Sequence, residues 1–128
     1  MTTVEQPCLG SAIRATAAFA GPDIWVAVAG GPAPHVGCVC LGVPRPSITG
    51  DGSASATVST INATGHKDDI VANELARRLA ARFGCTVSVT CGIHYERPDD
   101  AGLQRIMRDV AVLADKLEAA LALAQEKA

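Results

Sequence analysis

The order of the local patterns along the chain constrains its fold more than any single motif does. Short apolar runs with strand character fill the first half, whereas two later segments repeat apolar residues every three or four positions. Strands followed by helix, strand and helix predict an α+β fold with a largely antiparallel sheet. The expected strands are Ser11–Ala20, Ile24–Ala29, Val36–Val43, Ala54–Thr64 and Thr86–Ile93, and the expected helices are 68–83 and 98 to near the C-terminus.

A chain of 128 residues fits one domain. We expect residues 1–10 to be an N-terminal tail and residues 11–128 to form a single two-layer domain, in which two helices pack on a mostly antiparallel sheet of five to six strands. The first helix carries an apolar stripe of Ile70, Val71, Leu75, Leu79 and Phe83, and the second a longer one of Leu103, Ile106, Val110, Leu113, Leu117, Ala120 and Ala124. Two layers leave one sheet face uncovered, and part of the longer stripe can pack on a second subunit, so we expect a homodimer.

Composition excludes several classes of function. The formal net charge is −2 and aromatic residues make up only 3%, so the basic stripe and the stacking platforms of nucleic-acid-binding proteins are absent. The apolar runs are too short to cross a bilayer, and no basic segment followed by an apolar run opens the chain. We therefore expect a cytoplasmic protein whose five cysteines, none in a CxxC pair, are small buried residues.

All three histidines lie in short clusters rich in glycine and charged residues, each beside an expected strand. The clusters are Pro34–Gly37 with His35, Gly65–Asp69 with His66, and Gly92–Glu96 with His94. If these strand ends meet in space, three imidazoles would satisfy a divalent metal with open positions, as would two imidazoles and a carboxylate. No pair of histidines has the spacing of a local metal motif, so metal binding depends on the fold.

Two cationic segments fit an anionic ligand. Lys67 precedes the first helix, whose free amides and positive dipole end favour anions. Taken alone, this segment fits better as a helix start capped by Asp68 and Asp69, with His66 and Lys67 solvated. Arg45 stands between prolines in Pro44–Ser47, which we expect to be extended and irregular, and this segment taken alone also fits a surface turn with an exposed arginine better than a ligand site. Neither a GxGxxG or Walker loop nor a GxSxG elbow occurs, which disfavours the usual nucleotide folds and serine nucleophiles.

Taken together and in order, three stretches resemble the small D subunit of gallate-type decarboxylases. They are 34–47 with Pro-His-Val-Gly and Pro-Arg-Pro-Ser, 65–69 with Gly-His-Lys-Asp-Asp, and 92–94 with Gly-Ile-His. The resemblance covers roughly residues 10 to 110. It implies a fold like that of proteasome assembly chaperones and an association with UbiD-type decarboxylases, which use prenylated FMN.

The resemblance implies a protein that is not an enzyme but binds prenylated FMN, or FMN, and protects it for or delivers it to a UbiD-type decarboxylase. The expected cofactor site consists of His35, Arg45, Ser47, His66, Lys67, Asp68, His94 and Tyr95, and a divalent metal would be held by His35, His66 and His94. Two alternatives remain: a structural accessory subunit that docks on an aromatic-acid decarboxylase, and a small metal-dependent enzyme.

Overall fold

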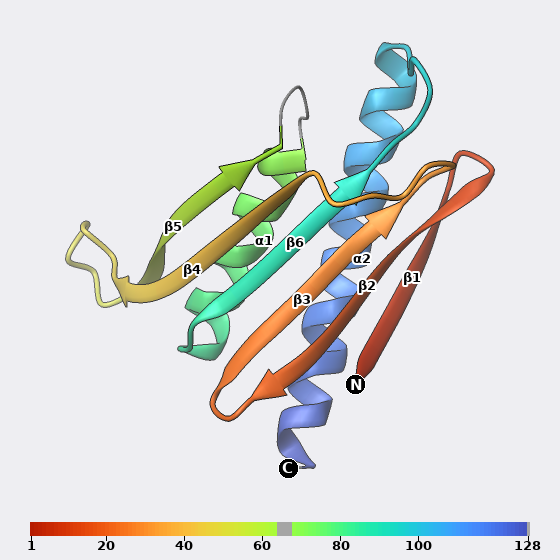
Figure 1. Cartoon of the computed structure of the whole chain (residues 1–128). Coiled ribbons are helices and arrows are strands. Elements are labelled where there is room, and N and C mark those ends of the chain that lie inside the picture. The colour runs from red at the N-terminus through yellow and green to blue at the C-terminus, as the bar shows by residue number, and fades with distance from the viewer. Residues whose placement is uncertain (64–67, 128) are drawn as a thin grey trace.

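The computed structural model describes residues 1–63 and 68–127, which form six strands and two helices (Figure 1). The strands are β1 (Thr2–Cys8), β2 (Ser11–Ala20), β3 (Asp23–Gly30), β4 (Cys38–Pro46), β5 (Ala54–Asn62) and β6 (Val87–Ile93), and the helices are α1 (Asp68–Phe83) and α2 (Asp100–Glu126).

The strands form one sheet in the order β1-β2-β3-β6-β4-β5. Every neighbouring pair is antiparallel except β3 and β6, which run parallel and are connected by a crossover through β4, β5 and α1. The predicted α+β fold, with a mostly antiparallel sheet and two helices, is therefore confirmed.

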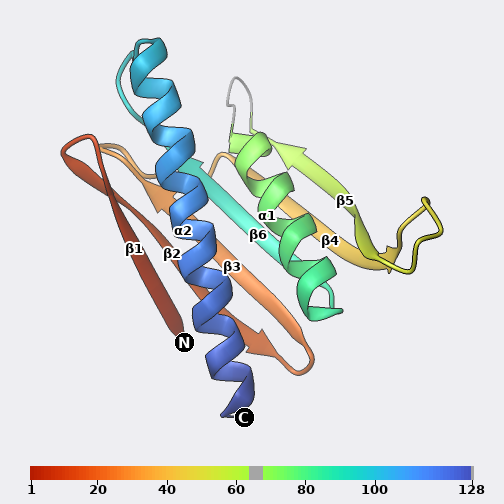
Figure 2. The ribbon, with the colours of Figure 1, turned by 180° about the vertical axis from the view of Figure 1, so that it is seen from behind.

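Both helices cover the same face of the sheet, and the other face is open (Figures 1 and 2). Strand side chains alternate between the two faces, so every second residue of a central strand, such as Val26, Val89 or Cys40, is buried beneath the helices. α2 contributes Leu117 and Leu121, which are fully buried, to the same core.

α1 packs on the sheet through small residues. Ala72, Ala76 and Ala80 are fully buried, whereas Ile70 of the expected stripe is 59% exposed. The helix lies so close to β4 that a methyl group on Gly42 would come within 2.7 Å of the Ala76 carbonyl oxygen. The alanines allow this approach. Leu75 and Leu79 of the expected stripe are buried as predicted, so the buried face keeps most of that stripe and adds the alanines in place of Ile70.

The expectation that residues 1–10 form a tail is wrong. Thr2–Cys8 is an edge strand whose residues pair with β2 from Thr2↔Ala17 to Cys8↔Ser11. It also lies beside α2, where the Gln6 side-chain amide donates to Asp109 at 3.4 Å and Lys116 donates to the Glu5 carbonyl at 2.9 Å. These contacts hold this mostly polar segment in place as a strand.

The expectation that Pro44–Ser47 is irregular is also wrong, because β4 continues to Pro46. The last residue of β4 that pairs with β6 is Gly42, and beyond it β4 pairs only with β5. Pro44 and Pro46 therefore lie in a part of β4 that has no neighbouring strand on one side. A proline has no N–H to donate, and on that side no hydrogen bond between strands is lost.

The C-terminus of α1 and the N-terminus of α2 lie where the sequence predicts them. Gly84, with φ of +63°, follows the end of α1, and the Asp99 side chain caps α2 by accepting from the Gly102 N–H at 2.7 Å. Along the described chain, neither helix combines the length and the apolarity needed to span a membrane.

Candidate functional site

The parallel pair β3 and β6 brings two of the three histidine segments together. Both strands end at the same edge of the sheet, and the loops that follow are held there by backbone hydrogen bonds. The His94 N–H donates to the Gly30 carbonyl at 3.1 Å, and the His35 N–H donates to the Gly92 carbonyl at 3.4 Å. α1 begins at the same edge with Asp68. We call His35, Asp68 and His94 the histidine corner.

Asp68 fixes the position of the corner. Its side chain is only 6% exposed, and its Oδ1 accepts from the Ile93 N–H at 2.9 Å. Its Oδ2 lies 3.2 Å from His35 Nε2, while His35 Nδ1 lies 3.2 Å from the Ala33 carbonyl oxygen. Both ring nitrogens thus face oxygen atoms, and these two contacts fix the orientation of the ring.

His94 is the more accessible member of the corner. Its ring centroid is 6.3 Å from that of His35, with the two rings nearly perpendicular, and its side chain is 42% exposed. Its Nε2 lies 3.5 Å from a carboxylate oxygen of Glu96, which is itself mostly exposed. A ligand can therefore reach this imidazole from solvent.

Glycines allow the three segments to approach each other. A methyl group on Gly92 would lie 1.6 Å from the His35 carbonyl oxygen, and one on Gly37 would lie 2.2 Å from Asp68 Oδ2. The backbone of the His35 loop thus rests directly on β6. Both glycines stand in the clusters that the sequence singles out, and their role is close packing of backbone.

Arg45 and Ser47 are not brought to the corner. Arg45 is seven residues beyond Cys38 on β4, which is about 23 Å at about 3.3 Å per residue. Its guanidinium donates to Thr57 Oγ1 at 3.0 Å and to the Pro46 carbonyl at 3.1 Å, while Ser47 Oγ lies 2.9 Å from Thr49 Oγ1. Both residues belong to the opposite end of the β4–β5 hairpin.

Tyr95 follows His94 in the sequence, but its side chain contacts the end of β1. Its hydroxyl donates to the Cys8 carbonyl at 2.9 Å, and its ring lies beside Gly31. Burial raises the pKa of this phenol well above its ordinary value. Its hydroxyl is therefore engaged with β1, and binding of a flavin by Tyr95 stays a prediction.

The remaining predicted site residues, His66 and Lys67, lie outside the described residues. Within 1–63 and 68–127, no group of three histidine, cysteine or acidic side chains is arranged to hold a metal ion. Metal binding by His35, His66 and His94 stays a prediction. The cysteines behave as the sequence predicts: all five are buried and free, and burial raises the pKa of Cys38 to about 11, which keeps its thiol protonated.

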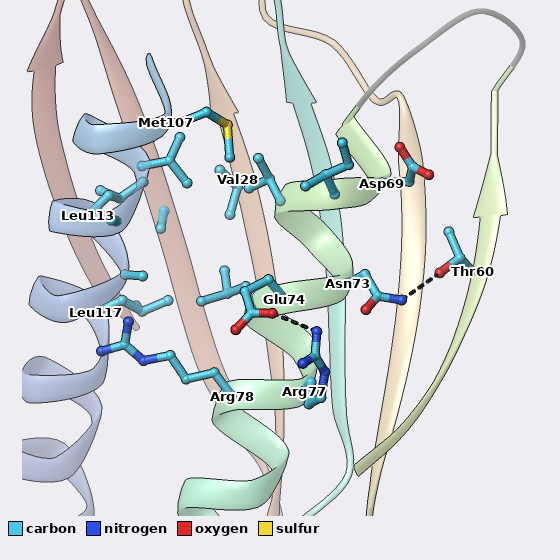
Figure 3. Close-up of a pocket in the computed structure, with 17 residues that line it drawn as sticks. Val28, Thr60, Asp69, Asn73, Glu74, Arg77, Arg78, Met107, Leu113 and Leu117 are labelled. Carbon is cyan, nitrogen blue, oxygen red and sulfur yellow. Dashed lines mark hydrogen bonds and ion pairs between the residues drawn. The ribbon is translucent and has the colours of Figure 1, made fainter. Parts of the chain in front are cut away.

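A groove lies between the two helices, and the sequence does not predict it. It encloses about 590 Å³ and is lined mainly by apolar side chains, with Val28 of the sheet below, Val71 and Leu75 on α1, and Met107 and Val110 on α2 (Figure 3). The volume lies within the usual range for small-molecule sites. The sequence signal for it is indirect: residues of both apolar stripes, such as Leu75 and Val110, line it.

The two cationic groups that line this groove, Arg77 and Arg78, are paired with carboxylates. Arg78 on α1 reaches toward α2 (Figure 3), where it binds Asp115 at 2.7 Å and Glu118 at 3.0 Å. Arg77 binds Glu74 on its own helix at 2.5 Å. The groove therefore suits an uncharged apolar group better than an anion.

The chain is thus a one-sided α+β sandwich with a polar corner at one sheet edge and an apolar groove between its helices, two features that could each hold part of a small ligand. Residues 8–122 match the family model of the prenylated flavin chaperone LpdD-like domain. The match covers most of the chain, so the chain belongs to this family. The family is one of chaperones for prenylated flavin, which confirms the prediction of a protein without enzymatic activity. The family does not support the alternative of a small metal-dependent enzyme.

A solved structure supports the fold. The chain is similar to a subunit in the crystal structure of a chaperone complex for yeast 20S proteasome assembly, with a TM-score of 0.52 and 16% identity over 92% of this chain and 93% of that one. At this identity the likeness concerns the fold alone, and it confirms the predicted proteasome-assembly-chaperone-like architecture. No curated protein matches the chain.

Proposed function

We propose that this chain binds prenylated FMN at the histidine corner, protects it there and delivers it to a UbiD-type decarboxylase. The observation that carries the proposal is the contact of His35 with Asp68, which joins two segments far apart in sequence and is fixed by the Ile93 N–H. Beside it, His94 is left with a large exposed fraction. A buried carboxylate that orients one imidazole next to an accessible one is suited to ligand binding.

The corner supplies groups for the polar part of a flavin. His94 can donate to a phosphate or a ring carbonyl. The N-terminus of α1, a helix of 16 residues, adds a positive dipole end. Lys67, which we expect to contribute a further positive charge, precedes this helix in sequence.

The ring system of the flavin requires an apolar surface. Tyr95 is engaged with β1, so the apolar side chains of the interhelical groove are the better candidates. The first turn of α1 contributes to both places, because Asp68 belongs to the corner and Val71, three residues on, lines the groove. A single ligand of flavin size would thus bind around the start of α1.

Binding is tested by mixing the purified chain with prenylated FMN and following flavin absorbance on a sizing column. Asp68→Asn and His94→Ala are expected to weaken binding about 10- to 100-fold, which is the worth of a hydrogen bond to a charged group. Arg45→Ala is the matched control and is expected to bind as the natural chain does. Absence of co-migrating flavin with the natural chain contradicts the function, whereas loss of binding in Arg45→Ala alone contradicts the placement.

Delivery is tested separately by adding a UbiD-type decarboxylase without its cofactor to the flavin-loaded chain. Transfer of the absorbance to the larger protein, followed by decarboxylase activity, is the expected result. The alternative, a structural accessory subunit, predicts a stable complex with the decarboxylase that Asp68→Asn does not weaken and no flavin transfer.

A further inference from the structure

The two edges of the sheet differ in how well they are protected from pairing with another chain. The edge strand β1 carries Glu5 and Pro7, and the Glu5 carbonyl accepts from the Lys116 ammonium at 2.9 Å. Charged side chains and prolines are devices by which natural proteins block an edge strand. The strand at the opposite edge, β5, has neither, because its nine residues, Ala54–Asn62, include no charged residue and no proline.

Hydrogen bonds at the two ends of the β4–β5 pair show which backbone groups of β5 face outward. The Ala63 N–H donates to the Gly37 carbonyl at 2.7 Å, and the Ser47 N–H donates to the Ser53 carbonyl at 2.9 Å. In an antiparallel pair, residues bonded to the partner strand alternate with residues whose N–H and C=O point away from it. The register is continuous between the two ends, so the odd-numbered residues of β5 are bonded to β4. The groups that point outward belong to Ala54, Ala56, Val58, Thr60 and Asn62.

The prolines of β4 agree with this assignment. Pro44 lies opposite Ala56, and Pro46 lies opposite Ala54. At these pairs no hydrogen bond joins β4 to β5, and the position of each missing N–H points to the side of β4 that has no neighbouring strand. The same alternation therefore holds along the whole of the β4–β5 pair.

The outward groups of β5 form a row that an extended backbone matches. N–H and C=O groups repeat at every second residue, about 6.6 Å apart at about 3.3 Å per residue. Along residues 1–63 and 68–127, no strand pairs with this side of β5, which is the outer edge of the sheet (Figures 1 and 2). A row of donors and acceptors with this repeat is the surface that binds a peptide when it adds to a sheet as a further strand.

The side chains beside this row indicate the composition of a strand that would fit. On the face opposite the helices, Ile61 is 76% exposed and pairs with Val39, which is 39% exposed, so a residue added beside Ile61 would have apolar neighbours. On the helix side the neighbours are polar, since the Asn73 amide donates to Thr60 Oγ1 at 3.4 Å. An extended segment of alternating apolar and polar residues, with the apolar ones opposite the helices, therefore fits this edge.

We propose that β5 is the docking edge for a partner protein, which adds such an extended segment to the sheet as a seventh strand. The inference rests on the proposed function in one respect: delivery of prenylated FMN requires a UbiD-type decarboxylase, and we assign the added strand to it. β5 ends at Asn62 opposite Cys38, and the neighbouring Gly37 packs against Asp68 of the histidine corner. A segment bound along β5 thus brings the decarboxylase to the place where the cofactor is released.

Amide hydrogen exchange followed by NMR tests which groups of β5 are open. In the free chain the outward amides of Val58 and Thr60 are expected to exchange faster than those of Ser59 and Ile61, which are bonded to β4. In a complex with a decarboxylase that lacks its cofactor, exchange of the two outward amides is expected to become slow. Equal rates in the free chain overturn the proposal. Protection of the outward amides that grows with chain concentration would mean that a second copy occupies the edge, and it overturns the proposal as well.

Two variants block the edge at residues that neither belong to the histidine corner nor line the groove. Ser59→Lys places a charge in the middle of β5, and Val58→Pro removes an outward N–H but no bond to β4. Each is expected to weaken binding of the cofactor-free decarboxylase at least about 10-fold, as expected for the loss of one or two hydrogen bonds. Ser59 is exposed, so this variant stays informative even where the loss of the half-buried Val58 lowers stability.

Thr3→Lys is the matched control, since it places the same charge on the exposed side of β1 at the opposite edge, and it is expected to bind the decarboxylase as the natural chain does. Binding that neither Ser59→Lys nor Val58→Pro weakens overturns the inference. So does a natural chain that retains prenylated FMN on the sizing column but does not bind the decarboxylase. A natural chain that retains no flavin contradicts the proposed function alone, because these binding measurements do not use flavin.

Discussion

Replacing Gly92 with alanine tests how the histidine corner is held together. The new methyl group would lie 1.6 Å from the His35 carbonyl oxygen and 2.9 Å from the Val36 nitrogen, and both of these atoms belong to backbone. To restore a separation of even 3.0 Å, the His35 segment must move away from β6 by about 1.4 Å. A shift of that size disrupts the 3.2 Å contact between His35 and Asp68 and the 3.4 Å bond from the His35 N–H.

The expected loss of stability combines two effects. Overpacking costs about 1–3 kcal/mol, and the lost hydrogen bond to a buried carboxylate costs about 1.5–3 kcal/mol, so we expect about 2.5–6 kcal/mol in total. At a slope of about 1.5 kcal/mol/M this lowers the urea midpoint by about 2–4 M. Flavin binding is expected to be weakened at least as strongly as in Asp68→Asn.

Gly102→Ala is the matched control for this substitution. Its methyl group meets only side-chain atoms, at 3.1 Å or more, and the position is helical, so the change is expected to leave stability within about 1 kcal/mol. Urea unfolding followed by circular dichroism measures both variants. An unchanged midpoint and unchanged flavin affinity for Gly92→Ala would refute the close packing of the His35 loop on β6.

Three further predictions concern the contacts around the sheet. Burial alone would raise the pKa of Asp109, but hydrogen bonds from Cys8, Arg105 and Gln6 hold this pKa below its ordinary value. The Asp109 carboxylate therefore stabilises the folded chain above the unfolded-state pKa near 3.8, and this stabilisation is lost as the pH falls through the folded-state pKa. Urea unfolding between pH 2 and 6 is expected to show a shallower acid loss for Asp109→Asn, and an equal slope would contradict this. Tyr95→Phe is expected to lose about 1–2 kcal/mol with the bond to Cys8. Tyr95 is the only tyrosine of the chain, and its pKa is raised in the folded state. The natural chain is therefore expected to lose stability as the pH rises above 10, whereas Tyr95→Phe is expected not to show this loss. An ultraviolet titration in which Tyr95 of the folded chain ionises at the ordinary pKa would contradict the prediction. Arg78→Ala removes two partly exposed ion pairs between α1 and α2 and is expected to cost about 0.5–1 kcal/mol, less in high salt; a salt-independent loss would point to packing instead.

Much of the fold can be predicted from local patterns. The β2–β3 hairpin, β6 and both helices lie close to the predicted positions, because turn residues and periodic apolar positions mark them. The edge strand β1 could not be predicted in this way. Its sequence, Thr2–Cys8, contains a proline and few apolar residues, and it is ordered by pairing with β2 and by contacts with α2.

The candidate site could be predicted only in part. His35, Asp68 and His94 meet because β3 and β6 are parallel neighbours, and a pattern along the chain does not specify which strands are neighbours. Arg45 was grouped with them on the resemblance, but the continuation of β4 through Pro44 and Pro46 carries it to the other end of the sheet. The interhelical groove depends on how far apart the two helices lie, which tertiary packing decides.

The parallel pairing of β3 with β6 also bears on the order in which the molecule folds. Ile24 pairs with Val87, and such a contact between remote parts of a chain carries a large loop-closure entropy and forms slowly. Since the histidine corner requires that pairing, we expect it to be assembled late, after the β2–β3 and β4–β5 hairpins have formed. Only the completed molecule would then capture its ligand, and binding would selectively stabilise it over every unfinished intermediate.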